Sequence, residues 1–288
     1  MLPEPTERLL RTIDVNPSAK DLLLVGGTAL TLRIAHRRSA DLDFAFSSKQ
    51  LPRRRIDGLL DDLRAEHEII ALANVAAERD FLDSGLEISD YQRDYSVGGV
   101  KVTFFTPDPA KLGEALRGDL GVHGLTRIRV ADLDSLFRMK AVTLNSRTAT
   151  RDLFDVYTLV RKHGYREEDI FGYARLFDFS PDTLKTRLRH ARRRADDPGI
   201  EVPDGVPPTF EQLQAFFVEA VNRVEQEQAE RAIRQRLPKP SGAGSADPKR
   251  GSLRERGPRK KSRRPSDRNS RDVTTRVLPT GGEDDGGL

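Results

Sequence analysis

The chain has 288 residues, of which 36% are hydrophobic and 33% charged, with a formal net charge of +4. It contains no cysteine, which excludes disulfides, thiolate chemistry and cysteine-ligated zinc. The N-terminus lacks the apolar core of a secretory signal, and no apolar run approaches the roughly 20 residues of a membrane-spanning helix. We therefore expect a cytoplasmic protein with no membrane partner.

The charge is unevenly distributed along the chain. Residues 238–288 hold 13 Lys and Arg against 7 Asp and Glu, a charge of +6, and almost no large apolar side chains. Such a segment cannot bury enough apolar surface to fold, so we predict a disordered basic tail that attracts nucleic acid non-specifically. Residues 1–237 carry about −2, so a basic surface in that part must be local.

The first predicted elements are a short helix over Thr6–Ile13 and a buried strand at the unbroken apolar run Leu22–Val25. Gly26-Gly27 then ends the strand. We expect the next helix to be capped by the side-chain oxygen of Thr28. It should end near His36–Arg38, where cations suit the C-terminal end of the helix dipole.

A second strand is predicted at Asp41–Phe46, where large apolar residues alternate with acidic or small ones. The spacing of apolar residues predicts a helix over Arg55–Leu72. Tyr91–Val97 and Val100–Phe105 are predicted to form a hairpin, because Gly98-Gly99 between them suits a two-residue turn.

After a short strand at Arg127–Val130, the pattern is helical from Ala131 onward. Strands with helices come first and helices alone follow, which indicates an α+β fold with a mixed sheet. We predict a core at 1–130, a helical domain at 131–237 and the tail at 238–288. Further helices are predicted at Asp152–Val160, Glu167–Leu176, Pro181–Ala195 and Thr209–Gln235, with a Pro/Gly-rich loop at Asp196–Pro208.

The glycine pair before the second helix can form a phosphate site. Backbone N–H groups at a helix N-terminus bind anions, and the missing Cβ atoms of Gly26 and Gly27 let a phosphate approach closely. An ordinary tight turn before a capped helix contains the same residue types. Gly26-Gly27-Thr28 is therefore a weak signal when taken alone.

Asp41 and Asp43 give a sharper signal, because residues i and i+2 of a strand project to the same face, about 6–7 Å apart. Neighbouring carboxylates repel unless a cation lies between them, and Mg²⁺ shares such ligands with substrate phosphates. The alternative is an edge strand with two solvated acids. The order of glycine turn, helix and Asp-x-Asp is much harder to obtain by chance, and it favours a site for a nucleoside triphosphate with Mg²⁺.

Three further features allow two interpretations each. Lys140 lies on the apolar stripe of its predicted helix, so its ammonium either reaches water or pairs with an anion such as a triphosphate or Asp152. Asp152 and Asp155 either serve the site or simply complement the start of a helix dipole. The basic run Arg187–Arg194 either contacts an RNA backbone or forms a solvated face.

These residues carry a resemblance to a known family. Gly26–Leu30 (GGTAL) followed by His36–Phe44 (HRRSADLDF) resembles the first motif of the nucleotidyltransferase toxins of AbiEii/AbiGii type, which belong to the polymerase-beta-like nucleotidyltransferase superfamily. Met139-Lys140-Ala141 and Arg151–Tyr157 (RDLFDVY) resemble the family's second block, a lysine followed by an Arg/Lys-Asp-x-x-Asp helix. The resemblance covers roughly residues 20–175, and its motifs are specific in combination.

The resemblance implies a polymerase-beta-like core followed by helices, and a role for each matching residue. Asp41 and Asp43 would ligate Mg²⁺, Lys140 would neutralise phosphate charge, and Asp152 would orient Lys140 or the nucleophile. The expected partners are an NTP, a tRNA or other RNA acceptor, and a cognate antitoxin encoded nearby. The residues expected to contact substrate are Gly26, Gly27, Thr28, Arg38, Ser39, Arg151 and Asp155.

The sequence departs from the superfamily at one position. A third carboxylate often lies on a later strand and takes the proton from the attacking hydroxyl, but here Thr103 occupies the place where we expect it. Threonine cannot act as a base at neutral pH. Substitutes open at this point are Glu87 or Asp90 on a neighbouring strand, or Asp43, or Asp152.

The expected function is Mg²⁺-dependent transfer of NMP from an NTP to an acceptor hydroxyl, in the toxin of a toxin–antitoxin or abortive-infection system. The acceptor expected from the resemblance is a tRNA end. One alternative is the same chemistry on a protein side chain. Another, suggested by Thr103, is a non-catalytic relative that binds nucleotide or RNA.

Overall fold

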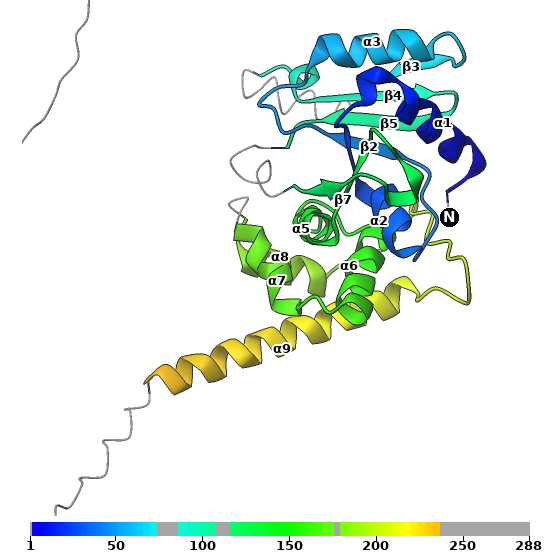
Figure 1. Cartoon of the computed structure of the whole chain (residues 1–288). Helices are drawn as coiled ribbons and strands as arrows, with labels where there is room; N and C mark the ends of the chain where they lie inside the picture. The colour runs from blue at the N-terminus through cyan, green and yellow to red at the C-terminus, as the bar shows by residue number, and fades with distance from the viewer. Residues whose placement is uncertain (1, 74–85, 108–115, 176–178, 237–288) are drawn as a thin grey trace, which may run out of the picture. The chain divides into compact units, whose positions relative to one another are not determined.

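A mixed sheet of seven strands lies at the centre of the computed structural model (Figure 1). The structure describes residues 2–73, 86–107, 116–175 and 179–236. Within these residues the strand order is β3-β4-β5-β2-β1-β7-β6, and β2 pairs in parallel with β5 and antiparallel with β1. The predicted α+β fold is confirmed. The strands are β1 Leu23–Val25, β2 Leu42–Ala45, β3 Ile69–Leu72, β4 Gln92–Val97, β5 Val100–Phe105, β6 Gly118–Asp119 and β7 Arg129–Ala131.

The strands around the glycine turn form where the sequence predicts them. β1 lies within the apolar run Leu22–Val25, and β2 lies within Asp41–Phe46. The hairpin of β4 and β5 turns at Gly98-Gly99, whose φ angles of +55° and +82° suit a two-residue turn. The strand predicted at Arg127–Val130 is β7, which begins two residues later.

The helix predicted over Arg55–Leu72 is wrong in its second half. Helix α3 covers Arg53–Leu63, and Ile69–Leu72 is the edge strand β3, paired with β4. No Gly or Pro separates the two elements, so the sequence contains no visible break between them. Isoleucine at 69 and 70 favours a strand, because β-branched side chains fit a pleated sheet.

Eight helices with described boundaries surround the sheet. In Figure 1, α5 to α9 lie together on the side of β7, whereas α3 lies beside β3 and β4. The last strand ends at Ala131, and the described elements after it are all helical. The helices are α1 Glu4–Val15, α2 Gly26–Ile34, α3 Arg53–Leu63, α5 Leu133–Thr143, α6 Thr150–His163, α7 Glu167–Ala174, α8 Pro181–Arg189 and α9 Phe210–Arg236.

One hydrophobic core joins the sheet to the helices. Phe44 and Phe104 stack on neighbouring strands with ring centroids 5.7 Å apart, and Phe137 and Phe217 extend the same core into α5 and α9. Each of these rings is fully buried, and full burial of such a side chain contributes roughly 1.5–3 kcal/mol. The helices after Ala131 therefore hold the sheet in place as well as each other.

Helix α8 ends at Arg189, short of the predicted Ala195. The side-chain amide of Gln214 on α9 donates to the carbonyls of Arg189 and Ala191, at 3.2 and 2.9 Å, which satisfies acceptors that a longer helix would use. The exposed cations that follow, Arg192–Arg194, lie in an irregular segment.

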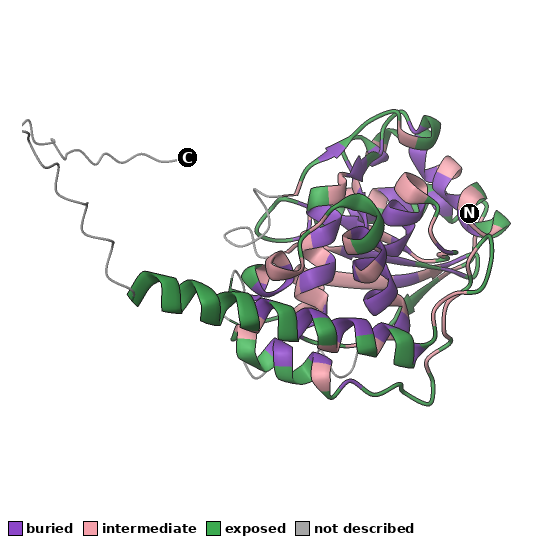
Figure 2. Ribbon diagram, turned by 90° about the horizontal axis from the view of Figure 1, so that it is seen from below, coloured by how far each residue is buried: buried purple, intermediate pink, exposed green. Residues whose placement is uncertain are grey.

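Helix α9 changes character along its length. Buried residues line its first half, from Phe210 to Val224, whereas residues 226–236 are exposed (Figure 2). The tail predicted at 238–288 lies outside the described residues.

Candidate active site

The acid pair stands where β2 begins. Asp43 lies within the strand opposite Val25 of β1, and Asp41 lies just before the strand. The Asp41 side chain is 37% exposed and has the Arg151 guanidinium 3.7 Å from its Oδ2. The charge of Asp41 raises the pKa of the Asp43 carboxyl, so the two carboxylates lie near enough to repel each other.

Gly26 and Gly27 make room for these side chains. Gly26 has φ +72°, and a Cβ built on it would lie 2.3 Å from Oδ2 of Asp43. A Cβ on Gly27 would lie 2.6 Å from Nη2 of Arg37 and 2.8 Å from Oγ of Ser39. The glycine pair therefore lets the catalytic strand and its preceding loop approach the start of α2.

Thr28 does not cap α2, contrary to the sequence prediction. The strand leads directly into the helix, so Val25 occupies the cap position and Thr28 lies inside the first turn. Its buried hydroxyl donates to the carbonyl of Asp41. The Thr28 side chain thus fixes the loop that carries Asp41.

The carboxyl of Asp43 has a raised pKa. Burial raises the pKa most, the charge of Lys140 lowers it, and the charge of Asp41 raises it again. A divalent cation between the two carboxylates would relieve both the burial cost and the repulsion. Among the described residues no group of three His, Cys, Asp or Glu side chains could hold a metal ion. The pair therefore fits Mg²⁺ only if substrate oxygens complete its ligands.

Lys140 is buried and paired. Its Nζ lies 2.9 Å from Asp152 and 2.7 Å from Asp155, both fully buried on α6. The guanidinium of Arg147 binds the other oxygen of Asp152 at 2.7 Å. Burial lowers the pKa of Lys140, but the two carboxylates raise it more, so the net shift is upward and the ammonium is retained.

Asp155 is fully buried among cationic and imidazole side chains of the protein, and its expected role as a substrate contact stays a prediction. Its carboxylate accepts from His36 at 2.7 Å and from Arg37 at 2.6 and 2.9 Å, besides Lys140. Burial raises the pKa of Asp155, but Lys140, Arg37 and His36 together bring it well below its usual value. His36 and Arg37, interpreted from the sequence as helix-end charges, instead bind Asp155 on α6 and so anchor the loop that leads to Asp41.

A carboxylate that the sequence interpretation missed lies beside Thr103. The sheet register places Asp43 opposite Thr103, and Thr103 opposite Asp94 of β4. The Thr103 hydroxyl donates to Asp94 at 2.7 Å, and Gln92 donates to the other Asp94 oxygen at 2.7 Å. Because paired residues on adjacent strands share a face, the three side chains form a row with Asp43 and Asp94 roughly 10 Å apart at their Cα atoms.

The other substitutes for the third carboxylate are occupied elsewhere. Glu87 and Asp90 lie in the short 3₁₀ turn Ile88–Asp90 or next to it, and both form ion pairs with Arg53. Asp152 is fully buried between Lys140 and Arg147. Only the hairpin register reveals Asp94, since the sequence places it nine residues before Thr103.

A hollow of about 310 Å³ opens beside Asp41. Three expected substrate contacts, Arg38, Ser39 and Arg151, line it together, which the sequence could not show. The opposite wall is the loop after α8: Glu201 accepts from the Arg38 amide at 2.8 Å and pairs with its guanidinium at 2.9 Å. Nothing in the local pattern of the predicted Asp196–Pro208 loop indicates that it reaches the acid pair.

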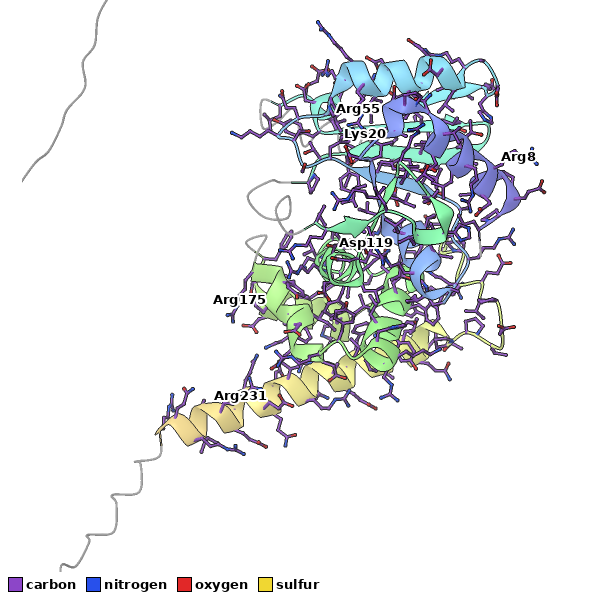
Figure 3. The ribbon with its side chains drawn as sticks, viewed as in Figure 1. Arg8, Lys20, Arg55, Asp119, Arg175 and Arg231 are labelled. Carbon is purple, nitrogen blue, oxygen red and sulfur yellow. The ribbon has the colours of Figure 1, made fainter. Side chains whose placement is uncertain are left out.

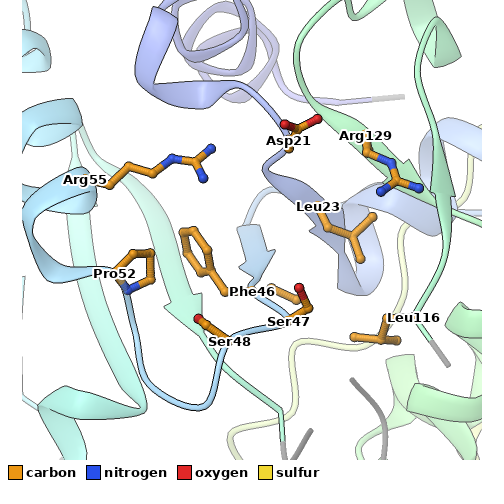
Figure 4. A pocket seen from close by; sticks show the side chains of 10 residues that line it. Asp21, Leu23, Phe46, Ser47, Ser48, Pro52, Arg55, Leu116 and Arg129 are labelled. Atoms are coloured by element: carbon orange, nitrogen blue, oxygen red, sulfur yellow. The ribbon is translucent and has the colours of Figure 1, made fainter. Parts of the chain in front are cut away.

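A second hollow of the same size lies at the opposite ends of β1 and β2 (Figure 4). Its two arginines are directed to backbone carbonyls, Arg55 to Ser18 at 2.9 Å and Arg129 to Gly118 at 2.7 Å. None of the expected site residues lines it. The candidate active site is therefore the region around Asp41 and Asp43.

The fold is a mixed sheet that brings an acid pair against a glycine turn, with a buried lysine close by. The model of the family described as nucleotidyl transferase AbiEii toxin, type IV TA system, matches residues 8–243, and the chain belongs to this family. The protein is thus a nucleotidyltransferase toxin of a toxin–antitoxin system, which implies a nucleotide substrate and a cognate antitoxin.

Similar proteins include the uncharacterized protein aq_aa25 of Aquifex aeolicus (strain VF5). It is 27% identical over 202 residues, which cover 68% of this chain and 84% of the relative. Among solved structures, JHP933 from Helicobacter pylori is 19% identical with a TM-score of 0.42, over 82% of this chain and 98% of that one. MenT4, a nucleotidyltransferase toxin of Mycobacterium tuberculosis H37Rv, is 15% identical with a TM-score of 0.45, over 78% and 89%.

None of the helices in the described ranges is long and apolar enough to cross a membrane.

Proposed function

We propose that the protein transfers NMP from an NTP to a hydroxyl of an RNA acceptor, with a tRNA end as the expected acceptor, and thereby arrests growth or aborts infection. The observation that carries this proposal is the acid pair itself. Asp43 is half-buried against Gly26, while Asp41 faces a hollow lined by Arg38, Ser39 and Arg151. Carboxylates and cations side by side suit a triphosphate with a divalent metal.

Asp41 and Asp43 would hold Mg²⁺, which supplies charge neutralisation at the phosphates and activates the attacking hydroxyl. Arg38, Ser39 and Arg151 would hold the triphosphate in the hollow, since guanidinium groups bind phosphate oxygens with two hydrogen bonds. The amides of Gly26, Gly27 and Thr28 would add donors, because the first amides of a helix lack intrahelical partners.

Lys140 acts from behind the acid pair. Because it is 7% exposed and held by Asp152 and Asp155, it supplies positive charge to Asp43 without leaving its carboxylate partners. This charge favours the ionised form of Asp43 that a metal requires. Asp155 in turn binds Arg37 and so fixes the loop that leads to Asp41. Residues of α6 therefore position both acids of the pair.

The proton of the attacking hydroxyl has a route through Thr103. As the acceptor oxygen bonds to the α-phosphorus and the bond to pyrophosphate breaks, the hydroxyl proton passes to Oγ1 of Thr103. The Thr103 proton passes at the same time to Asp94, to which it already donates. Asp94 then serves as the base for which Thr103 alone is unsuited.

The acceptor is tested by incubating the protein with each α-labelled NTP, Mg²⁺, total tRNA and cell extract. The proposal predicts label that RNase removes and protease leaves. Label that resists RNase and migrates with protein would instead favour nucleotidylation of a protein hydroxyl. Bound NTP without transfer to either acceptor would favour a non-catalytic relative and overturn the proposal.

A further inference from the structure

A third hollow, of about 600 Å³, lies against helix α8. Its walls come from α8, from the residues just after it and from the loop that precedes α6. The lining is rich in hydroxyl and cationic groups. We call this hollow the α8 groove and define it by six of its lining residues: Thr148, Thr183, Thr186, Arg187, His190 and Arg192.

Arg187, His190 and Arg192 of the α8 groove have no carboxylate partner within the described ranges. Arg187 donates only to the Ser146 carbonyl at 3.4 Å, and neither His190 nor Arg192 forms an ion pair with a described residue. The one acid at the rim, Asp182, is already paired with Lys185 at 3.1 Å.

Neighbouring arginines behave differently. Arg189 on the same helix binds Glu225, and Arg194 binds Asp196 at 2.9 Å through two nitrogens. Arg231 on α9, labelled in Figure 3, binds Glu168 at 3.2 Å. The sequence allowed two interpretations of the basic run Arg187–Arg194. Arg189 and Arg194 in this run are neutralised by carboxylates, whereas Arg187 and Arg192, which line the groove, are not.

Two chain segments connect the α8 groove to the acid pair. Thr148 in the groove and Arg151 beside Asp41 are three residues apart, a span of roughly 10 Å at most. On the other wall the chain runs from Arg192 to Gly199, and midway Asp197 accepts from the amide and hydroxyl of Thr150, both at 2.8 Å. The groove and the hollow at Asp41 thus lie on either side of the contact that Asp197 makes at the N-terminus of α6.

We propose that the α8 groove holds the phosphodiester backbone of the acceptor RNA and directs its end to Asp41. Arginine, histidine and threonine side chains suit phosphate oxygens. The lining holds no Phe, Tyr or Trp, and apart from the His190 ring and the Asp182 carboxylate its polar groups are hydroxyls and guanidiniums that suit phosphates, so we expect the contacts to be largely independent of sequence. This inference rests on the proposed function, because it names where the RNA acceptor of that reaction binds.

The test compares two full-length double variants with the same change in charge. Arg187→Gln with Arg192→Gln removes the unpaired groove cations. Arg194→Gln with Arg231→Gln removes two paired surface cations and is the control. Both variants keep the basic tail. Affinity for short oligouridylate and oligoadenylate is measured as a function of salt, together with NTP affinity and the transfer kinetics.

We expect the groove variant to bind both oligonucleotides roughly tenfold more weakly, with a salt slope smaller by about 1.4, or 0.7 for each lost phosphate contact. The acceptor KM should rise while kcat and the NTP affinity hold. Equal RNA affinity and equal acceptor KM in the two variants would overturn the proposal that the groove binds RNA. This would hold even if the groove variant lost binding of an acidic protein. If the groove variant bound RNA more weakly and with a smaller salt slope, but the wild type transferred no NMP to RNA, the RNA-binding role of the groove would stand and RNA as the acceptor would be rejected.

Discussion

At the residue scale, the backbone of Gly26 lies closer to Asp43 than any side chain would allow. Its φ of +72° also belongs to the left-handed region, which other residues enter at a cost. A glycine turn that leads into a helix is usually interpreted as a phosphate cradle. In this protein the first consequence of the glycine is the position of the carboxylate.

Gly26→Ala should therefore displace Asp43 and lower the transfer rate by about 10²-fold or more, because shifts near 1 Å have such effects. The matched control is Gly58→Ala on α3, where a Cβ meets no atom within 4 Å and should stabilise the helix by roughly 0.5–1 kcal/mol. Initial rates and thermal unfolding of both variants check the prediction. Normal activity of Gly26→Ala would show that the carboxylate position is not critical.

Asp94→Asn should reduce kcat by roughly 10²-fold and leave the KM for NTP unchanged, because the proton route loses its acceptor. Thr103→Val should have a similar effect, since it removes the hydroxyl between Asp94 and Asp43. Asp90→Asn, at the Arg53 ion pair, is the control. The measurement is kcat and the KM for NTP of the wild type and the three variants under the same conditions. An unchanged kcat would remove Asp94 from the reaction.

Asp155→Asn should destabilise the fold by about 3–5 kcal/mol, because it leaves Lys140 and Arg37 buried with too little negative charge. Asp169→Asn breaks an exposed pair with Arg166 and should cost less than about 1 kcal/mol. Denaturant unfolding of the two variants measures the difference. Equal midpoints would contradict the role of Asp155 as the anchor of the site.

At the element scale, helix α1 is joined to the sheet through one carboxylate. Asp14 accepts from the amides of Thr126, Arg127 and Ile128 just before β7, and from the Thr126 hydroxyl. Burial raises the pKa of Asp14, but these four donors lower it more, so the net shift is downward. A lowered pKa means that the ionised carboxylate stabilises the folded state.

This stabilisation should be present above the unfolded pKa of about 3.9 and be lost as the pH falls through the lower, folded value. Asp14→Asn should therefore cost about 1.5–3 kcal/mol at pH 7. The gap between wild type and variant should shrink below pH 4. Unfolding free energies at pH 7 and pH 3 check both statements, and a gap that stays constant with pH would contradict them.

Elements with their own local signal are predicted well from the sequence. The hairpin turn at Gly98-Gly99 and the strand of Asp41–Phe46 carry periodicity and turn chemistry that need no distant partner. β3 and the end of α8 were mispredicted because their limits depend on pairing with β4 and on Gln214 of α9. Helical spacing alone contains no information about those neighbours.

At the scale of the whole molecule, the site is assembled from parts far apart in the sequence. The motif residues Asp41, Asp43, Lys140 and Asp152 were identifiable because they match a known pattern. Asp94 and Glu201 were not, because only the sheet register and the packing of the loop after α8 bring them to the acid pair. Predicting them requires the fold.

The most direct test of the account is the rate of labelled NMP transfer to tRNA, with pyrophosphate release, for wild type, Asp43→Asn and Asp61→Asn. Asp61 is an exposed acid on α3 paired with Arg64, and its variant should keep the wild-type rate. The account predicts that Asp43→Asn lowers both signals by at least about 10²-fold while the fold and the RNA affinity are retained. Transfer by Asp43→Asn at the wild-type rate would contradict the assignment of the acid pair as the catalytic centre.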